Sequence, residues 1–328
     1  MKYIFLLFIF AFMFSCSDGI DKNIDDNVNE EKWLVDETYI KEGAPFTFID
    51  NPSFKKVNEI ENVSDDDLVI MFNYKGRVKV FPYVYLNYSE VVNDKIDDLE
   101  YIASYCPQTK SGICFNKVIG GKSLNMFASG FLFKDNLVLT SQEEDVFWSQ
   151  MLLTGIKGSQ KYMEINDLFS IETTWKTIKD YFPMAQVYYH NLLSRGQVNK
   201  YNSVKKAKST KFFGIVNGGI ENSVEVFPYS SFSKLKLNKL IVNGRQTIVI
   251  GDESKNIFTS FYEPTGENLE LDTSFPLVLK DNKGNRWNIF GEAIEGPKKG
   301  TKLASPSFFH AELWAWNFFY KNNVTMHN

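Results

Sequence analysis

Two cysteines near the middle of the chain are the residues whose type and spacing point most directly to chemistry. Cys106 and Cys114 lie in the segment SYCPQTKSGICFN, residues 104–116. Cys106 ends a strand-like run and precedes Pro107, which lacks a backbone donor and stops a strand. A thiol at a strand end beside a loop can be activated as a nucleophile or a metal ligand. The alternatives are a Cys106–Cys114 disulfide, or a buried and unpaired Cys114 inside its strand with Cys106 as a structural residue.

A nucleophilic cysteine needs a base within hydrogen-bonding reach, and histidines are scarce in this chain. His327 lies in the terminal tail, His190 lies in a connecting region, and His310 begins an expected helix, where capping or packing is its commoner role. No Gly-x-Ser-x-Gly elbow, phosphate-binding glycine loop or His-Glu-x-x-His helix is present. We therefore lean against an enzyme and predict no cofactor. A thiophilic metal such as copper or zinc at Cys106 is the alternative.

Other polar and aromatic side chains in the first half of the chain are candidate ligand-binding residues. Asn93 and Asp94 carry oxygens that bind cations, although their context and the following KIDD favour a turn. Trp148 and Gln150 belong to the polar and aromatic segment FWSQ, and Ser129 lies in the strand-like ASGFLF. A tryptophan at a repeated position is more often a core residue than a platform for a ligand.

The second half of the chain repeats motifs of the first half in the same order. The similar pairs are residues 76–86 and 222–232 (both with VFPY), 147–160 and 286–299, and 169–183 and 307–321. The first pair is separated by 146 positions and the last by about 138. Co-linear similarity at one spacing indicates two divergent copies of one unit.

Each copy has mainly the pattern of strands, with one helix at its end. Two β-rich runs surround Lys75-Gly76, which predicts a hairpin. In TTWKTIKDYF, Thr173 or Thr174 can cap a short amphipathic helix whose apolar residues recur at spacings of three and four. No long helices alternate with the strands, so antiparallel pairing is expected. The predicted fold class is mostly β (α+β), with each copy built of several antiparallel strands closed by a short helix, and both packed as one body.

The N-terminus has the features of a lipoprotein signal peptide. Lys2 precedes an apolar run over residues 3–14, which is too short to span a bilayer and typical of a secretory h-region. Ser15-Cys16 resembles a bacterial lipobox, which implies that Cys16 becomes the lipidated mature N-terminus. Ser17 in place of an aspartate resembles lipoproteins that reach the outer membrane. We expect a lipid-anchored outer-membrane protein, with the leaflet left open.

Composition and patterning divide the rest of the chain. The predicted segments are a signal peptide at 1–15, an acidic tether at 16–42, a first β-rich unit at 43–185, a linker at 186–211, a second unit at 212–322 and a tail at 323–328. The net charge is −4 and the one short basic run is expected to be a linker, so nucleic acid is not an expected partner. Expected partners are the lipid bilayer, through acylated Cys16, and an unidentified ligand or envelope protein.

Several motifs resemble an uncharacterised bacterial family, the domain of unknown function 3179. The matching segments are FIDNPSF (48–54), VFPYVYLNYSEVVND (80–94), SYCPQTKSGICFN (104–116), ASGFLF (128–133), FWSQ (147–150), GIKG (155–158) and TTW (173–175). The resemblance extends over nearly the whole mature chain. Members have no established activity, so the resemblance implies architecture more than function.

This chain departs from the family pattern at positions that bear on a metal or redox site. By this resemblance, Ser89 stands where many members have a histidine, and Thr109 stands where many have a second cysteine after Cys106. Lys134 and Asn136 occupy positions where neutral and acidic groups are common. A soft-metal site of histidine and paired cysteines would therefore have lost partners here.

Together these patterns lead to one leading hypothesis and one rival. The leading hypothesis is an outer-membrane lipoprotein whose duplicated β-rich body binds a ligand or partner, with its site in the first copy around the candidate residues. The rival is an envelope enzyme or metal/redox protein centred on Cys106.

Overall fold

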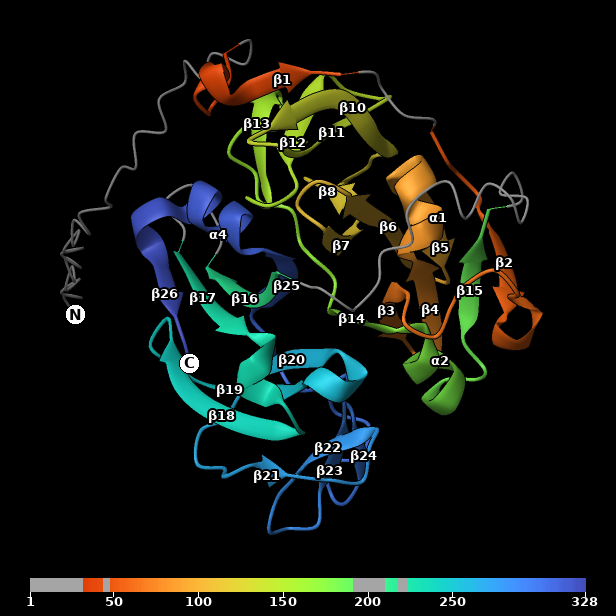
Figure 1. Cartoon of the computed structure of the whole chain (residues 1–328), viewed down its shortest axis with the longest axis vertical. Helices are drawn as coiled ribbons and strands as arrows, with labels where there is room; N and C mark the ends of the chain where they lie inside the picture. Colours follow the sequence, from red (N-terminus) through yellow and green to blue (C-terminus); the bar gives the residue numbers. More distant parts are fainter. Residues whose placement is uncertain (1–31, 44–47, 191–209, 218–222) are drawn as a thin grey trace, which may run out of the picture.

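The computed structural model describes residues 32–43, 48–190, 210–217 and 223–328. Most of the regular structure is β-strand, and the strands form several mainly antiparallel sheets, as predicted (Figure 1). We call residues 32–190 the first half and residues 210–328 the second half. The predicted signal peptide and Cys16 lie outside the described residues, and so does most of the predicted linker.

The first half contains two sheets of five strands, one of three and one of two. The largest central sheet has the order β14 (Ser170–Thr174), β3 (Leu68–Tyr74), β4 (Arg77–Pro82), β15 (Gln186–Tyr189) and β2 (Ser53–Lys56). The three-stranded sheet consists of β5 (Val91–Ile96), β6 (Leu99–Cys106) and β7 (Ser111–Asn116). The second five-stranded sheet has the order β1 (Ile40–Glu42), β10 (Met126–Phe133), β11 (Asn136–Ser141), β12 (Val146–Ser149) and β13 (Thr154–Gly158), and β8 (Val118–Ile119) pairs with β9 (Lys122–Ser123).

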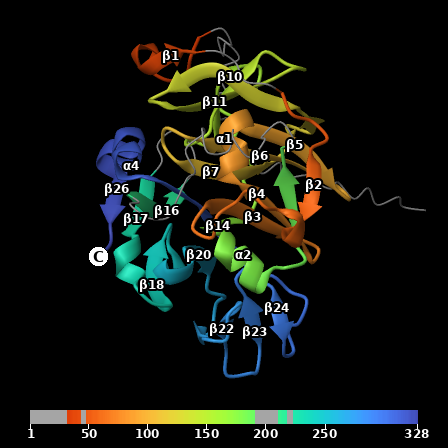
Figure 2. The same ribbon diagram turned by 45° about the vertical axis from the view of Figure 1, so that its right-hand side comes forward.

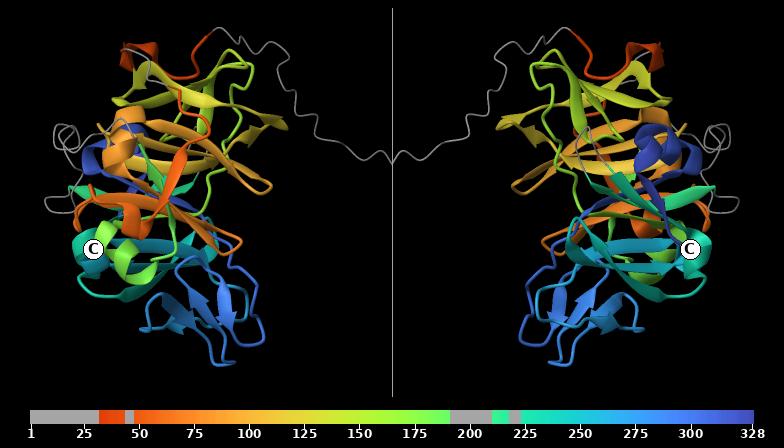
Figure 3. Two further views of the ribbon diagram at one scale, coloured as in Figure 1. Left: turned by 90° about the vertical axis from the view of Figure 1, so that its right-hand side faces the viewer. Right: turned by 90° about the vertical axis from the view of Figure 1, so that its left-hand side faces the viewer.

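The second half is built from three sheets. Their strand orders are β25 (Ser307–Glu312), β16 (Lys211–Asn217), β17 (Ser223–Pro228) and β26 (Val324–Met326); β18 (Lys236–Val242), β19 (Arg245–Asp252) and β20 (Ile257–Tyr262); and β21 (Glu270–Leu271), β22 (Leu277–Lys280), β23 (Arg286–Asn288) and β24 (Ala293–Glu295). Figure 3 shows the sheet of β1 and β10–β13 at one end of an elongated body and the sheet of β21–β24 at the other.

Short helices connect and cover these sheets. The α-helices are α1 (Tyr83–Ser89), α2 (Trp175–Tyr181) and α4 (Leu313–Tyr320), and the 3-10 turns are η1 (Glu37–Tyr39), η2 (Val57–Glu59), η3 (Tyr229–Phe232), η4 (Glu253–Lys255) and η5 (Lys321–Asn323). Figure 2 shows α2 of the first half above β23 and β24 of the second. Phe182, at the end of α2, contacts Phe290 with ring centroids 5.8 Å apart.

Corresponding strands in the two halves pair in the same order and direction. β3 pairs antiparallel with both β4 and β14, and β16 pairs antiparallel with both β17 and β25. The outer neighbours β15 and β26 then pair parallel to β4 and β17. A sheet of three antiparallel strands follows in each half, β5–β7 in one and β18–β20 in the other.

Two local sequence signals produce the structures predicted from them. Lys75 and Gly76, with φ of 48° and 82°, form the turn between β3 and β4, a conformation that suits the twist of a two-residue hairpin. Thr174 caps α2, because its Oγ1 accepts a hydrogen bond of 3.3 Å from the backbone N–H of Thr177. The helix at the end of the second half, α4, is likewise present.

Other segments differ from the prediction because sheet pairing recruits them. The tether contributes β1, the linker contributes β15 and the first residue of β16, and the tail contributes β26. Each pairs through backbone groups with a longer strand, a partner that its own short sequence does not reveal. Residues 83–89 form α1 although Val and Tyr favour strands, since the helix buries Tyr83, Val84, Tyr85 and Leu86.

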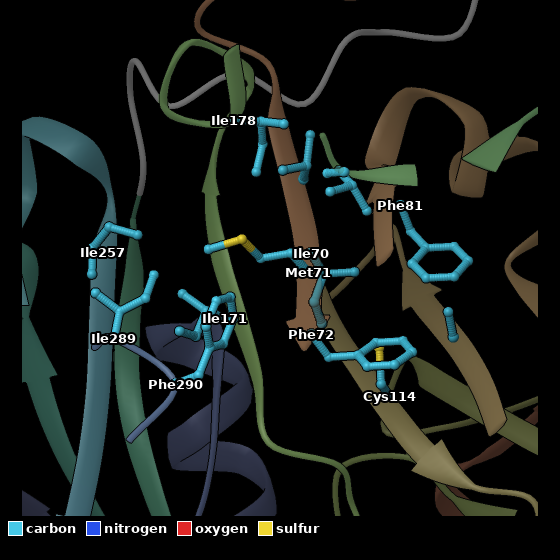
Figure 4. Packing of buried hydrophobic residues seen from close by; sticks show 14 of the residues in the cluster. Ile70, Met71, Phe72, Phe81, Cys114, Ile171, Ile178, Ile257, Ile289 and Phe290 are labelled. Atoms are coloured by element: carbon cyan, nitrogen blue, oxygen red, sulfur yellow. The ribbon is translucent and has the colours of Figure 1, made fainter. Parts of the chain in front are cut away.

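One hydrophobic core extends across both halves. Ile70 and Phe72 of β3 belong to the same buried cluster as Ile257 and Phe290 of the second half, and Figure 4 shows these side chains converging with Ile171 of β14 between them. Shared burial of this kind makes the halves one packed unit. No helix in the described part of the chain is long and apolar enough to cross a membrane.

Candidate functional site

Cys106 and Cys114 lie on opposite faces of the sheet β5–β6–β7. In its register Cys106 pairs with Ser111 and Cys114 pairs with Ala103. Side chains alternate between faces along a strand, so residues 103 and 106, which are three positions apart in β6, lie on opposite faces. Both thiols are buried and free. The alternative of a Cys106–Cys114 disulfide is therefore wrong, and the buried, unpaired Cys114 is confirmed.

The Cys106 thiol is enclosed by the protein. It is about 1% exposed, and its Sγ donates a weak hydrogen bond to the carbonyl oxygen of Asp135 at 3.8 Å. Burial raises the pKa of this thiol, and hydrogen bonding with Thr109 offsets only part of the effect. A thiol with a raised pKa stays protonated at neutral pH, whereas catalytic and metal-binding cysteines act as thiolates.

A buried network of neutral polar side chains lies beside Cys106. Asn136 Nδ2 donates to Thr109 Oγ1 and to Gln150 Oε1, both at 2.9 Å. Ser111 Oγ donates to Gln150 Oε1, and Gln150 Nε2 donates to Ser104 Oγ, both at 2.8 Å. These hydrogen bonds join β6, β7 and β11 with their loops, so the network holds the interior of the first half together.

This network includes Thr109 and Asn136, two of the positions that the family resemblance singled out. Thr109 and Asn136 are bonded to each other, and Cys106 contacts Thr109. Ser89 instead ends α1, where its side chain is fully buried. The candidate Gln150 is thus a structural hydrogen-bonding residue.

Glu90 is an unusual carboxyl group next to this network. It follows α1 with a φ of 56°, in a region that residues other than glycine rarely adopt. Its backbone N–H donates to the carbonyl of Leu86 and its carbonyl accepts from Tyr105, at 2.6 and 2.8 Å. Burial raises the pKa of Glu90 to about 7. The Glu90 charge also contributes to the raised pKa of the Cys106 thiol and so disfavours a thiolate.

Asn93 and Asp94 lie inside β5, so the predicted turn is wrong. Asn93 is fully buried and connects two segments, since its Nδ2 donates to the carbonyls of Ile49 and Met126 and its Oδ1 accepts from the Met126 N–H. Asp94 accepts hydrogen bonds from Tyr101 and Lys79. The strand continues because these partners satisfy the polar side chains within the sheet.

Ser129 and Trp148 also have structural positions. Ser129 Oγ donates to the Val138 carbonyl at 2.7 Å and accepts from the Phe131 N–H at 3.0 Å, within an irregularity of the β10–β11 pairing. Trp148 is fully buried in a hydrophobic cluster that includes residues of both halves. The predicted site residues are therefore spread over several core positions and do not line one ligand site.

The most strongly charged buried cluster lies between the halves and was not among the sequence candidates. Glu172 of β14 forms an ion pair with Lys211 of β16, and both side chains are about 1% exposed. The Glu172 carboxylate also accepts from Tyr83 at 2.8 Å, and from Tyr229 and Asn256 at 3.3 Å. Burial opposes ionisation of Glu172, but Lys211 and the other donors outweigh it, and its pKa lies below the usual value.

His310 belongs to this cluster, and its predicted place at the start of a helix is wrong. It lies in β25, where its Nδ1 is hydrogen-bonded to the Tyr229 hydroxyl at 2.5 Å. Burial lowers the pKa of His310 to about 4, although the Glu172 carboxylate opposes the change. The imidazole is therefore neutral at physiological pH.

Stacked aromatic rings support the two tyrosines of the cluster. Tyr83 stacks on Tyr105 at a centroid distance of 4.2 Å, and Tyr105 pairs across the sheet with Gly112. Tyr229 stacks on Phe258 at 4.3 Å, and Phe258 pairs with Gly251. In the β6–β7 hairpin the aromatic residue of the pair, Tyr105, is on the first strand and the glycine on the second. In the β19–β20 hairpin the order is reversed, with Phe258 on the second strand.

Open space lies elsewhere, along the loop before β25. Cavities of about 600, 210 and 520 Å³ all include Lys302 in their walls, and the first two also share Leu303. The largest is formed by the start of β19, the turn after β20 and residues 298–304. These distant segments come together only in the folded chain.

Two cations in the largest cavity are available to a ligand. The Arg245 guanidinium lies 3.4 Å from the centre of the Tyr262 ring, and stacking of this kind orients the planar group. Within the described residues, neither Arg245 nor Lys302 is hydrogen-bonded to a carboxylate. In contrast, the carboxylates of the same cavity are engaged: Glu263 binds Lys239 and Glu267 binds Lys298.

Comparison of the sequence with family models agrees with the resemblance found in its motifs. The model described as a protein of unknown function, DUF3179, matches residues 45–323. The chain belongs to the DUF3179 family. Comparison with curated proteins and with solved structures gives no match. The function of this DUF3179 protein therefore has to be inferred from its own geometry.

The described part of this DUF3179 protein has no cluster of side chains suited to a metal ion, that is, no group of three or more His, Cys, Asp and Glu residues arranged to hold one. The signal that would have found Glu172 and Lys211 is a charged residue within the strand-like runs SIETT and KFFGIV. Arg245 and Lys302 carry no such signal, because only tertiary structure places them in one cavity.

Proposed function

We propose that this DUF3179 protein is a lipid-anchored binding protein of the cell envelope that holds an anionic ligand in the cavity of Arg245 and Lys302. The observation that carries the proposal is that two cations lining a cavity of about 600 Å³, Arg245 and Lys302, form no ion pair with a described carboxylate. A stacked guanidinium offers paired N–H donors that match a carboxylate or phosphate. The net charge of −4 makes this cationic cavity stand out from the chain as a whole.

We further infer that the binding body arose by duplication. Support comes from the repeated VFPY motifs and from the shared pairing scheme, in which Pro82 pairs with Val69 and Pro228 pairs with Phe212. The duplicated body would place the ligand cavity in the second copy. The sequence-based expectation placed the site in the first copy.

The anchor rests on the N-terminal sequence. The short apolar run and Cys16 support lipidation, and two or more acyl chains give a stable membrane anchor. The outer membrane is the proposed location, and either leaflet is compatible with the sequence. Cys16→Ala protein should lose its partitioning into the membrane fraction; a variant that remains there would contradict lipidation.

The rival function, an enzyme or metal/redox protein centred on Cys106, has weaker support. Its thiol is buried, its pKa is raised, and Glu90 further disfavours the thiolate. The neighbouring side chains that define its surroundings are neutral amides and hydroxyls. Such a group is suited to packing and hydrogen bonding in the interior.

Calorimetric titration of the mature chain, starting after Cys16, tests the binding function. The probes are glucuronate, citrate and inorganic phosphate, with glucose as a neutral control. We expect at least one anion to bind, Arg245→Gln to weaken it roughly tenfold, and Ala304→Trp to block the cavity that Ala304 lines. Lys280→Gln, on an exposed side chain of β22, makes the same charge change and should have no effect. Absence of binding, or equal binding by Arg245→Gln, would refute the proposed cavity.

A further inference from the structure

Three cavities adjoin at Lys302, and we call their combined surface the groove. The largest is bounded by Arg245 and Tyr262, and the next by Asp167 and Phe169 of the first half. The third lies between the β3–β4 turn at residues 73–76 and residues 292–300. Because Lys302 is common to all three and its backbone forms a β-bridge with Glu292, the cavities meet at this residue.

Three cationic side chains along this groove form no ion pair with a described residue, whereas its carboxylates have hydrogen-bond or ion-pair partners. Lys299 lines the third cavity, and like Arg245 and Lys302 it is exposed and makes no ion pair with a described residue. The groove walls lower the pKa of Lys302, while Glu292 opposes the change. An anionic ligand would add to the favourable interaction that Glu292 makes with this ammonium.

The acidic side chains of the groove have donors of their own. Glu292 accepts two hydrogen bonds of 2.8 Å from the Asn73 amide. Asp167 accepts from Ser307 at 2.6 Å, and burial raises the pKa of this carboxyl. These groups are therefore weak competitors for the three cations.

The first two cavities expose polar and apolar atoms in similar amounts, whereas the third, which includes Ala293 and Ile294, is mainly apolar. Gln246, Thr265 and Thr301 line the first cavity, and Ser305 and Ser307 line the second. Their hydroxyl and amide groups suit the hydroxyls of a carbohydrate, whereas peptide recognition usually relies on apolar pockets for side chains. Rings at the edge of the groove, Tyr262 and Phe169, are already covered by Arg245 and Lys302.

We propose that the groove binds an extended acidic polysaccharide, whose carboxylates contact Arg245, Lys302 and Lys299 in turn while its hydroxyls bond to the polar side chains of the walls. This inference rests on the proposed function and adds both the length and the chemical class of the ligand. A single carboxylate would bind in the cavity of Arg245 and Lys302, and longer chains would also engage Lys299. Binding of this kind weakens as salt screens the exposed charges.

Titration with oligogalacturonates of increasing length tests the inference. The affinity should rise by roughly tenfold for each further cation engaged, and fall as sodium chloride is raised. Lys302→Gln and Lys299→Gln should each reduce the affinity for long chains. Lys299→Gln should leave the affinity for galacturonate monomer largely unchanged. The matched control is Lys280→Gln, which should bind chains of every length as the unaltered protein does.

The remaining outcomes separate the two proposals. A small anion that binds at Arg245 without any gain from chain length would overturn the extended glycan and leave the binding function standing. Equal or tighter binding of polyglutamate of similar length would overturn the carbohydrate class, and binding of neutral dextran would overturn the role of charge. If no anion of any length binds, both proposals fail.

Discussion

Glu172 of the first half and Lys211 of the second form an ion pair that is closed off from solvent. Removing one partner leaves the other charged and without compensation in the interior. We expect Lys211→Met to lower the free energy of unfolding by about 3–5 kcal/mol. Urea unfolding followed by tryptophan fluorescence measures the change.

A double variant separates the charge effect from a loss of packing. Glu172→Gln combined with Lys211→Met leaves neutral groups that still bond to Tyr83 and Asn256, so it should be more stable than Lys211→Met alone. Lys41→Met breaks an exposed ion pair with Asp135 and should have little effect. A double variant as unstable as the sum of the two single changes would show that the ion pair is not the source of the effect.

Glu90 predicts a fall in stability with rising pH. Its pKa in the folded protein is about 7, compared with an ordinary value of 4.5. Between these values the folded protein retains the proton while the unfolded chain has released it, so raising the pH favours unfolding. Below pH 4.5 the burial of Glu90 does not lower the free energy of unfolding, because the carboxyl is protonated in both states. By pH 8 it lowers the free energy of unfolding by up to about 3 kcal/mol.

Glu90→Gln should flatten this pH dependence, because its amide stays neutral. Denaturant midpoints measured from pH 4 to pH 8 provide the comparison. Glu270→Gln, at an exposed position of β21, is the control and should keep the slope of the unaltered protein. An identical slope in Glu90→Gln would assign the pH dependence to other groups.

Thiol labelling tests the enclosure of both cysteines. In the mature chain without Cys16, Cys106 and Cys114 are buried, and we expect neither to react with Ellman's reagent under native conditions within the time that complete labelling takes in guanidinium. Native mass spectrometry of the labelled protein counts the modified thiols. Rapid modification of one equivalent in the folded state would restore Cys106 as a reactive site.

Gln150 should contribute strongly to stability although it contacts no ligand. Gln150→Leu would remove one hydrogen bond each from Asn136, Ser111 and Ser104 in the interior. We expect the free energy of unfolding, measured with urea, to fall by about 2–3 kcal/mol, because three buried hydrogen bonds are lost. Gln246→Leu, at an exposed position, should change the midpoint little; equal effects would show that the buried network is not required.

Local signals account for the parts of the fold that the sequence predicts well. The hairpin at Lys75-Gly76 and the cap of α2 by Thr174 depend on neighbouring residues. In contrast, the hydrogen-bond partners of Asn93 lie 33 to 44 positions away in the sequence. They stabilise Asn93 in a strand, and the local sequence, which predicted a turn, does not show them. The site was harder still to predict, because Arg245 and Lys302 share a cavity only through tertiary packing.

The opposite placement of Tyr105 with Gly112 and of Gly251 with Phe258 has an evolutionary consequence. A Cβ at Gly112 would lie 2.2 Å from the Tyr83 hydroxyl, and one at Gly251 would lie 2.4 Å from the Phe232 ring. Copying a single residue from one half into the other therefore introduces either a steric overlap or an empty volume. If the halves descend from one ancestor, recombination between their gene segments would combine side chains whose volumes do not fit at this position. Selection against such recombinants would keep the two coding sequences distinct.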